Sequence, residues 1–310
     1  MSKKIALLFA GQGAQAVGMG KDLCDAFPVA AALFKKADAL LPFSLSQLTF
    51  EGPTEELTKT ANCQPALYVH GLACLAALKE RRPDLQFHAA AGLSLGEFTA
   101  HAAAGTFDFE TGLDLVANRA RYMQQACDET QGTMAAMIGA EENTVRDLAA
   151  AADVDIANLN CPGQIVVSGE SSKISMAVSL AKDYGVRRAT ELNVAGAFHS
   201  RLMESAYQKL KEKLETTTIV SPQIPVVCNV DAIPVSTPED IRRTLSDQVT
   251  GSVRWTESVE YLLDHLHCDL LIELGPGGIL AGLVGRIRKG TQVLSISNAA
   301  TLEEVANAIG

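Results

Sequence analysis

The chain has 310 residues, 47% of them hydrophobic and 20% charged, a composition typical of a compact globular protein with about two domains and unlike that of disordered or fibrous chains. Its 26 Lys and Arg against 36 Asp and Glu give a formal net charge of −10, which argues against nucleic acid or an anionic membrane as a partner, because binding phosphates needs a concentrated positive surface. Seven scattered cysteines without a CxxC pair predict neither a zinc site nor a disulfide framework, and free thiols favour the cytoplasm.

The first third of the chain predicts strands that alternate with helices. The run from Ile5 to Phe9 is expected to be a buried strand, since it is continuously apolar and ends before Gly11 and Gly13. The apolar stretch is also too short for a signal peptide. No apolar stretch reaches the roughly 18 residues of a membrane span. Further elements are expected at 21–38 (helix), 64–81 (helix, with Pro65 in its first turn), 87–91 (strand) and from the following glycines to about 103 (helix). This alternation is typical of an α/β fold with a parallel sheet.

Residues 131–195 show a different pattern, which predicts an inserted domain. Six short elements follow one another: strand 133–138, helix 141–152, strand 154–159, strand 164–168, helix 172–184 and strand 187–192. This βαββαβ order is the ferredoxin-like signature. The first pattern then resumes, with helices near 200–214, 239–248, 255–264 and 278–288 and strands near 225–228 and 269–273. We therefore expect a large α/β domain made of 1–130 and 196–310, with its cleft facing a small ferredoxin-like domain.

A GxSxG motif at 92–96 lies between a predicted strand and a predicted helix. This is the nucleophile-elbow pattern, in which a sharp turn exposes the hydroxyl of the central serine, here Ser94, at the start of the helix. Two glycines that ease an ordinary turn would give the same letters. The flanking strand and helix favour the elbow. A serine nucleophile needs a base, most often a histidine.

One of the six histidines suits the role of base better than the others. His199 follows a strand and precedes a helix, which places it beyond the carboxyl ends of the strands, where active sites of open α/β sheets lie. A helix-capping role is the alternative. The other five have simpler interpretations. His101 lies two turns along the helix after Ser94 and points away from it, His70 is expected in the core, and His88 opens a strand at the end opposite Ser94. His265 and His267 end a helix, where a helix-end charge is the simpler role.

Eight motifs stand along the chain in a recognisable order. They are GQGAQ at 11–15, QPAL at 64–67, GLSLGE at 92–97, Arg119 with Met123 and Gln124, NLNCPGQ at 158–164, GAFHS at 196–200, Gln248 with Trp255, and ELGPG at 273–277. With these motifs the chain resembles the malonyl-CoA:acyl carrier protein transacylases of fatty-acid synthesis, from Gly11 to about Arg288. The resemblance implies a large hydrolase-like α/β domain that carries a ferredoxin-like insert, in agreement with the pattern of elements.

The resemblance also implies roles for individual residues. Ser94 would attack the thioester carbonyl of malonyl-CoA while His199 takes its proton, and the malonyl-serine ester would then pass to the phosphopantetheine thiol of an acyl carrier protein. The backbone N–H groups of Leu95 and Gln12 would bind the oxyanion. The backbone carbonyl of Gln248 would orient His199, so that the site is a dyad. The resemblance implies no metal and no cofactor.

Arg119 separates a malonyl enzyme from one that takes neutral acyl groups. It stands in a largely apolar helical run from Leu113 to Met123, where a solvent-facing arginine is the simpler interpretation. In the family that the chain resembles, the residue at this position holds the free carboxylate of malonate. A guanidinium suits that task because its planar fork pairs with a carboxylate through two hydrogen bonds.

Four positions depart from the family pattern. Leu93 stands where many members have His, Ala14 and Cys161 where serine is common, and Ser252 where proline is common. None of the four carries an implied catalytic role, so we expect activity to survive these changes.

We therefore expect a cytoplasmic, monomeric malonyltransferase that serves fatty-acid synthesis. The alternatives are a trans-acting malonyltransferase of polyketide synthesis, a hydrolase that clears acyl groups from carrier proteins, and a catalytically dead module that binds carrier protein. An acidic carrier protein needs a local basic surface on an acidic enzyme. Candidates for that surface are Arg187, Arg188, Arg286, Arg288 and Lys289.

Overall fold

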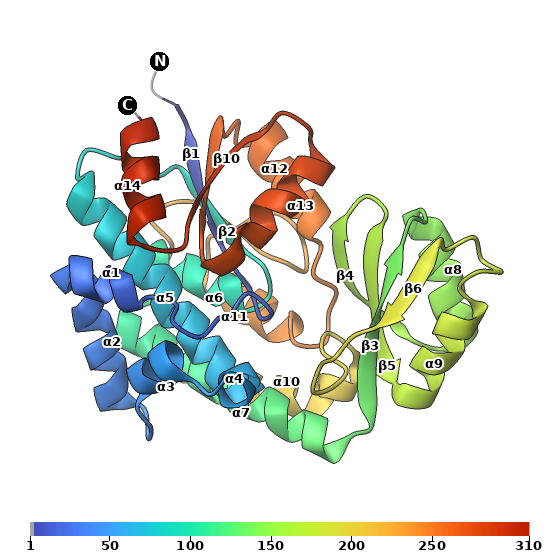
Figure 1. Cartoon of the computed structure of the whole chain (residues 1–310). Helices are drawn as coiled ribbons and strands as arrows, with labels where there is room; N and C mark the ends of the chain where they lie inside the picture. Colours follow the sequence, from blue (N-terminus) through green and yellow to red (C-terminus); the bar gives the residue numbers. More distant parts are fainter. Residues whose placement is uncertain (1–2, 310) are drawn as a thin grey trace.

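The computed structural model describes residues 3–309 and contains two sheets, each packed with its own helices (Figure 1). The strands of the larger sheet are β1 (Ile5–Phe9), β2 (Ala89–Gly92), β7 (Val226–Val227), β8 (Pro234–Val235), β9 (Leu270–Leu274) and β10 (Gln292–Ile296). Their order is β10-β9-β1-β2-β7-β8, and every neighbouring pair is parallel except β7 with β8. The predicted α/β fold with a parallel sheet is confirmed.

Helices cover both faces of this sheet, which is why its central strands are largely apolar. Leu7 and Phe9 belong to one core and Ala6 and Leu8 to the other, as the alternation of side chains along a strand requires. The first core includes α1 (Lys21–Ala26), α2 (Pro28–Leu40), α3 (Leu45–Glu51), α4 (Thr54–Thr58), α5 (Thr60–Arg81), α6 (Leu95–Ala103), α7 (Phe109–Glu129), α10 (Glu204–Glu215), α11 (Pro238–Asp247) and α14 (Ala299–Ala308). The second core lies under α12 (Trp255–Asp264) and α13 (Ile279–Ile287).

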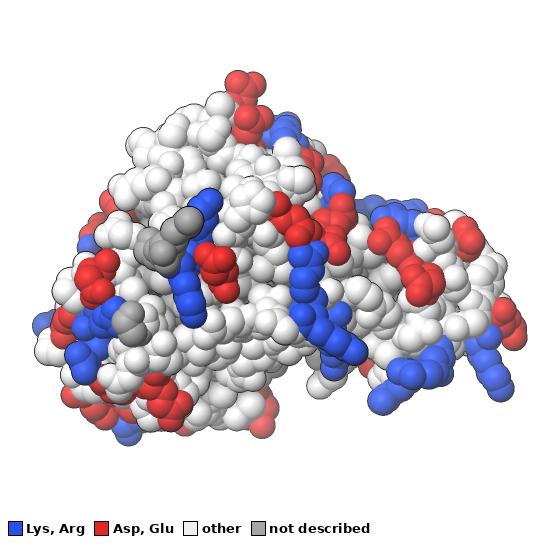
Figure 2. Space-filling view, turned by 90° about the horizontal axis from the view of Figure 1, so that it is seen from above, with Lys and Arg blue, Asp and Glu red and all other residues white. Residues whose placement is uncertain are grey.

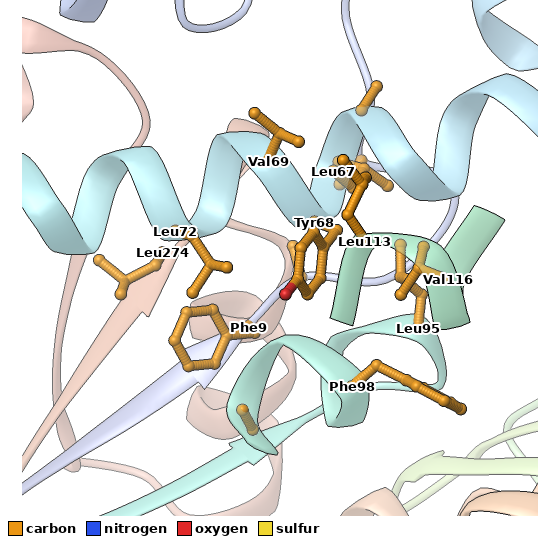
Figure 3. Packing of buried hydrophobic residues seen from close by; sticks show 14 of the residues in the cluster. Phe9, Leu67, Tyr68, Val69, Leu72, Leu95, Phe98, Leu113, Val116 and Leu274 are labelled. Carbon is orange, nitrogen blue, oxygen red and sulfur yellow. The ribbon is translucent and has the colours of Figure 1, made fainter. Parts of the chain in front are cut away.

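The central helix α5 packs directly on the sheet and on α6. Figure 3 shows Tyr68 and Leu72 of α5 next to Phe9 of β1, with Leu95 and Phe98 of α6 close by. Burial of this many large apolar side chains fixes α6, and with it the turn that precedes α6. Of the helices within residues 3–309, none is long and apolar enough to cross a membrane.

The smaller sheet is antiparallel and stands beside the larger one (Figure 1). Its strands are β3 (Gly132–Ile138), β4 (Asp155–Cys161), β5 (Gln164–Glu170) and β6 (Arg188–Glu191), in the order β4-β5-β3-β6. The helices α8 (Glu142–Ala152) and α9 (Ser171–Leu180) share a separate core with these strands. The element order is the predicted βαββαβ, while the domain boundaries at 131 and 195 stay a prediction.

Several predicted helices have different bounds in the structure; the helix expected at 172–184, for example, ends at Leu180. The helix expected at 21–38 is broken at Phe27, whose extended backbone (φ −128°, ψ 108°) follows from the restriction that Pro28 places on the residue before it. The helix expected from residue 64 begins already at Thr60, so Pro65 lies inside the helix and the prediction that it occupies the first turn was wrong. The sequence patterns also missed α3, α4, α14, β8 and β10.

Candidate active site

The turn after β2 has the backbone of a nucleophile elbow. Ser94 has φ 54° and ψ −107°, an unfavourable conformation for a residue with a side chain. Both glycines of the motif are required by close packing: a Cβ on Gly92 would lie 2.0 Å from the carbonyl of Gly96, and a Cβ on Gly96 would lie 2.1 Å from the backbone oxygen of Phe9. The backbone of the turn therefore packs closely against the start of α6 and against β1.

Asn229, which follows β7, braces the elbow. Its Oδ1 accepts a hydrogen bond from the Ser94 backbone N–H at 2.7 Å, and its Nδ2 donates to the Gly92 carbonyl at 2.8 Å. The strained backbone of Ser94 is thus held by a side chain from a neighbouring strand end. We did not single out Asn229 in the sequence, where the only available signal was its place after a predicted strand.

His199 lies within hydrogen-bond distance of the serine hydroxyl. Its Nε2 is 2.8 Å from Oγ of Ser94, and its Nδ1 is 2.8 Å from the backbone oxygen of Gln248. Because a carbonyl only accepts, Nδ1 must carry the proton, which leaves Nε2 free to accept the proton of Ser94. The structure therefore brings three predicted site residues together in the tautomer that a general base needs.

The environment of His199 keeps its imidazole neutral. Burial and, to a smaller extent, the cationic Arg119 lower the pKa of His199 to about 4. The ring is thus unprotonated throughout the neutral range, ready to accept a proton. His199 itself has a positive φ of 56° and precedes a short 3-10 turn, η1 (Arg201–Met203), so it lies just before the helical segment and not in it.

Arg119 is fully buried on α7, so the solvent-facing interpretation is wrong. Its Nη1 donates to Oε1 of Gln64 at 2.6 Å, and its Nη2 donates to Oε1 of Gln248 at 2.8 Å and to Oγ of Ser94 at 3.1 Å. Burial lowers the pKa of Arg119 to about 10, which leaves the guanidinium charged at neutral pH. A cation therefore lies directly beside the serine hydroxyl.

Two backbone N–H groups near Ser94 are free to bind a further acceptor. Neither Leu95 nor Gln12 donates its N–H to any acceptor among residues 3–309. The loop after β1 lies close to the elbow, since a Cβ on Gly11 would be 2.4 Å from the Leu93 carbonyl. The side chain of Gln12 is fixed by a hydrogen bond to Oγ1 of Thr60 at 3.2 Å. The arrangement is suited to an oxyanion, and the two roles stay predictions.

Two further side chains complete the hydrogen-bond network, Gln64 and Glu97. The sequence motifs contained both, but we assigned them no role. Gln64 binds Arg119, and its Nε2 is 3.4 Å from Oε1 of Gln12. Glu97 accepts from Nε2 of Gln248 at 2.6 Å. Only the three-dimensional structure reveals these partners, because they come from segments far apart in the chain.

Two of the other histidines are buried and form hydrogen bonds that do not involve Ser94. His70 is buried with Nε2 3.2 Å from the Ser297 backbone oxygen, and the buried His101 has Nδ1 3.0 Å from Oγ1 of Thr106. Across residues 3–309, no group of three or more His, Cys, Asp or Glu side chains could hold a metal ion.

The smaller sheet holds the segments that carry His199 and Gln248. Arg201, two residues after His199, donates to both carboxylate oxygens of Asp155 in β4. The segment after Gln248 pairs with the same strand, where the Val253 N–H donates to the Ala157 carbonyl at 2.8 Å. Ser252 donates to the Ile156 carbonyl at 2.5 Å, a bond that the more common proline could not make.

Comparison with known proteins agrees with this geometry. The model of the family described as "Acyl transferase domain" matches residues 6–281. The malonyl CoA-acyl carrier protein transacylase of Bacillus subtilis is 40% identical over 97% of this chain and 95% of its own length. The polyketide biosynthesis malonyl CoA-acyl carrier protein transacylase of the same organism is 41% identical over 94% and 99%.

A solved structure shares the fold of this chain as well as its sequence. The crystal structure of an acyl-carrier-protein S-malonyltransferase from Bartonella henselae superimposes with a TM-score of 0.94, at 38% identity and over 99% of both chains. Family model, sequence relatives and fold therefore agree over nearly the whole chain. The chain belongs to the acyl transferase domain family.

Proposed function

We propose that the chain transfers a malonyl group from malonyl-CoA to the phosphopantetheine thiol of an acyl carrier protein, supplying fatty-acid synthesis. His199 takes the proton of Ser94 as Oγ attacks the thioester carbonyl, and the N–H groups of Leu95 and Gln12 bind the oxyanion. Collapse of the tetrahedral intermediate breaks the C–S bond, and the coenzyme A thiolate leaves with the proton from His199. The product of this half-reaction is a malonyl-serine ester.

The second half-reaction repeats these steps with another thiol. His199 takes the proton of the phosphopantetheine thiol, whose sulfur attacks the ester carbonyl at Ser94. The oxyanion again lies between Leu95 and Gln12, and the proton returns to Oγ as the acyl group leaves. Because coenzyme A and the carrier protein both end in a phosphopantetheine arm, one pocket serves both steps.

The single observation that carries the choice of malonyl is the position of Arg119. The fully buried guanidinium lies 3.1 Å from the nucleophile Oγ of Ser94, between two carboxamide oxygens. An acyl group with a free carboxylate would pair with this cation, whereas a neutral acyl group would leave it desolvated and without a counter-ion. This also argues against the acyl hydrolase alternative. The dyad geometry of Ser94 and His199 argues against a catalytically dead binding module.

A malonyltransferase of polyketide synthesis is the remaining alternative, supported by the 41% identity to such an enzyme from Bacillus subtilis. It would use the same residues for the same chemistry. The two differ in the carrier protein that they serve, so transfer rates to a fatty-acid and to a polyketide carrier protein separate them.

We propose that the enzyme acts in the cytoplasm as a monomer and meets its carrier protein through local basic side chains. On the face in Figure 2, basic and acidic side chains are interspersed over the larger lobe, and several Lys and Arg side chains project from one rim of the smaller lobe. Among the candidates, Arg288 is paired with Asp264, while Arg286 donates to Oε1 of the neutral Gln164 at 2.6 Å. Arg286 therefore keeps its charge available for an acidic partner.

Two half-reaction assays test this proposal. Purified enzyme with malonyl-CoA and holo carrier protein should give malonyl carrier protein, read as a mass shift on the carrier. Arg286→Glu should raise the Michaelis constant for carrier protein in a salt-sensitive way and leave acylation by malonyl-CoA unchanged. Absence of malonyl carrier protein would contradict the function, and equal effects of Arg286→Glu on both half-reactions would contradict the docking surface.

A further inference from the structure

A buried carboxyl group beside the site has no part in the steps above. Glu97 lies three residues after Ser94 on α6 and is fully buried. Its Oε2 accepts hydrogen bonds from Nε2 of Gln248 at 2.6 Å and from the Asn229 backbone N–H at 3.0 Å. Its Oε1 has no hydrogen-bond partner among residues 3–309. Burying a carboxyl group with an unpartnered oxygen costs free energy, so we ask what its remaining hydrogen bonds do for the site.

The contact with Gln248 decides which way the carboxamide of Gln248 faces. Nε2 of Gln248 also donates to the Ser94 carbonyl at 3.0 Å, and Oε1 accepts from Nη2 of Arg119 at 2.8 Å. Turning the amide over would bring its oxygen against two acceptors and its NH2 group against the guanidinium. Both contacts would be repulsive, so the network permits a single orientation.

We propose that Glu97 is a positioning residue for carboxylated acyl groups: its Oε2 fixes the carboxamide of Gln248, whose oxygen in turn holds Arg119 where the acyl carboxylate binds. The inference rests on the proposed function and deepens it. Glu97 touches neither the substrate nor the reacting atoms in this account. It acts through Gln248 and Arg119.

The role needs an oxygen in the right place and does not need a negative charge. Burial raises the pKa of Glu97 to about 8, against the opposing effects of Gln248, Asn229 and Arg119, so the group is largely uncharged at neutral pH. Oε2 of an uncharged carboxyl still accepts hydrogen bonds. A substitution that keeps the oxygen in place but removes the acid should therefore preserve the role.

Withdrawing that oxygen should release the amide. The Asn229 N–H would lose its acceptor, and Gln248 lies close enough to supply one, since its Nε2 and that N–H donate to the same oxygen of Glu97. An unpaired buried donor is costly, so the amide oxygen of Gln248 would turn from Arg119 toward that N–H. Arg119 would then lose one of its hydrogen-bond acceptors.

A pair of variants separates position from charge. Glu97→Gln keeps the length of the side chain, and the backbone N–H of Asn229 directs the new amide oxygen inward. Glu97→Asp keeps the acid but shortens the side chain by one methylene. The measurement is the ratio of kcat/KM for acylation by malonyl-CoA to that by acetyl-CoA. Glu97→Asp should lower this ratio about ten- to hundredfold, the loss of one hydrogen bond to a charged group, while Glu97→Gln stays within about threefold of wild type.

Glu273 provides the matched control. It is equally buried and accepts hydrogen bonds from the N–H groups of Leu280 and Ala281 at the start of α13. Glu273→Asp should lower the melting temperature and leave the malonyl-to-acetyl ratio unchanged.

A ratio that falls as far in Glu97→Gln as in Glu97→Asp would overturn the inference, as would an unchanged ratio in Glu97→Asp. If Glu97→Asp fails to fold, Glu97→Gln alone still decides, because a large fall there contradicts the role. The proposed function is tested separately: it fails if the wild-type enzyme does not prefer malonyl-CoA, whatever the variants do.

Discussion

The two sheets of this protein make different contributions to one site. The larger sheet supplies the nucleophile and one proposed oxyanion donor, since Ser94 follows β2 and Gln12 follows β1 at neighbouring strand ends. The antiparallel sheet supplies none of the proposed catalytic side chains. Its strand β4 instead binds the segments that follow His199 and Gln248. The larger sheet thus positions the nucleophile, and the smaller sheet positions the segments next to the base and its carbonyl partner.

The dyad of Ser94 and His199 therefore depends on packing between segments that lie far apart in the chain. Ser94 is held by its own elbow and by Asn229, both of which follow strands of the larger sheet. The segments that follow His199 and Gln248 are bound to strand β4 of the smaller sheet. We therefore expect substitutions near the larger sheet to abolish chemistry and substitutions at the contact with the smaller sheet to weaken it.

The largest expected effect comes from His199→Ala. Removing the base should slow acylation by malonyl-CoA about 10⁴-fold or more, as for other dyad and triad members, because Ser94 is then a weak nucleophile. Single-turnover acylation followed by mass spectrometry measures the rate. A loss below about tenfold would show that another group takes the proton.

Arg119→Ala should change the choice of substrate. Truncating one partner of a buried charge pair costs on the order of 2–5 kcal/mol, so malonyl transfer should fall roughly 30-fold to several thousand-fold. Acetyl transfer should be spared or even rise. The ratio of catalytic efficiencies for the two thioesters, in wild type and variant, is the readout.

Two other outcomes of the Arg119→Ala measurement would contradict this expectation. A parallel fall for both substrates would show that Arg119 supports the fold or binds the coenzyme A phosphates. An unchanged ratio would contradict a role in substrate choice.

Lowering the pH should destabilise the part of the chain around the larger sheet first, because residues 131–195 contain no histidine. Burial lowers the pKa of His70 to about 4 and of His101 to about 3. Between these values and the ordinary pKa of about 6.5 the unfolded chain binds more protons, so each histidine removes stability as the pH falls, by at most about 1.4 kcal/mol per pH unit. The raised pKa of Glu97 opposes this trend between about pH 8 and 4.5.

A single variant isolates the histidine contribution. The free energy of unfolding of His101→Gln, measured by urea titration, should fall less steeply than that of wild type between pH 6.5 and 4.5. The difference in slope should approach about 1.4 kcal/mol per pH unit. Equal slopes would show that the pKa of His101 is the same in the folded and the unfolded protein.

The smallest effect is expected where the smaller sheet meets the loop of His199. Arg201 pairs with Asp155 through a two-pronged contact, but its side chain is 58% exposed, and exposed ion pairs contribute only about 0–1 kcal/mol. Arg201→Ala should therefore slow acylation a fewfold with little change in melting temperature. Arg146→Ala removes a comparable exposed pair with Glu142 on α8 and should leave acylation unchanged. Equal rates for both variants would contradict the aligning role.

Local sequence patterns predicted much of this molecule for identifiable reasons. The glycines around Ser94, the buried strand before it and the βαββαβ order of the insert all depend on short-range constraints. The break at Phe27 was missed because the apolar periodicity continues across it, although Pro28 provided the signal.

Side chains that act through others were harder to foresee. Asn229 reaches Ser94 across 135 positions of sequence, and Glu97 meets Gln248 across 151. Neither pairing leaves a local pattern, because each arises only when strand ends come together. The family resemblance suggested Arg119 and Gln248, whereas the burial of Arg119 became visible only in the folded chain.

The central claim is that Ser94 carries the malonyl group between two thiols. Wild-type enzyme mixed with malonyl-CoA, digested and analysed by mass spectrometry should carry one malonyl group on the peptide that contains Ser94. The label should disappear when holo carrier protein is added, and Ser94→Ala should acquire none. Label on Ser94→Ala, or label on a different peptide of the wild type, would contradict the account.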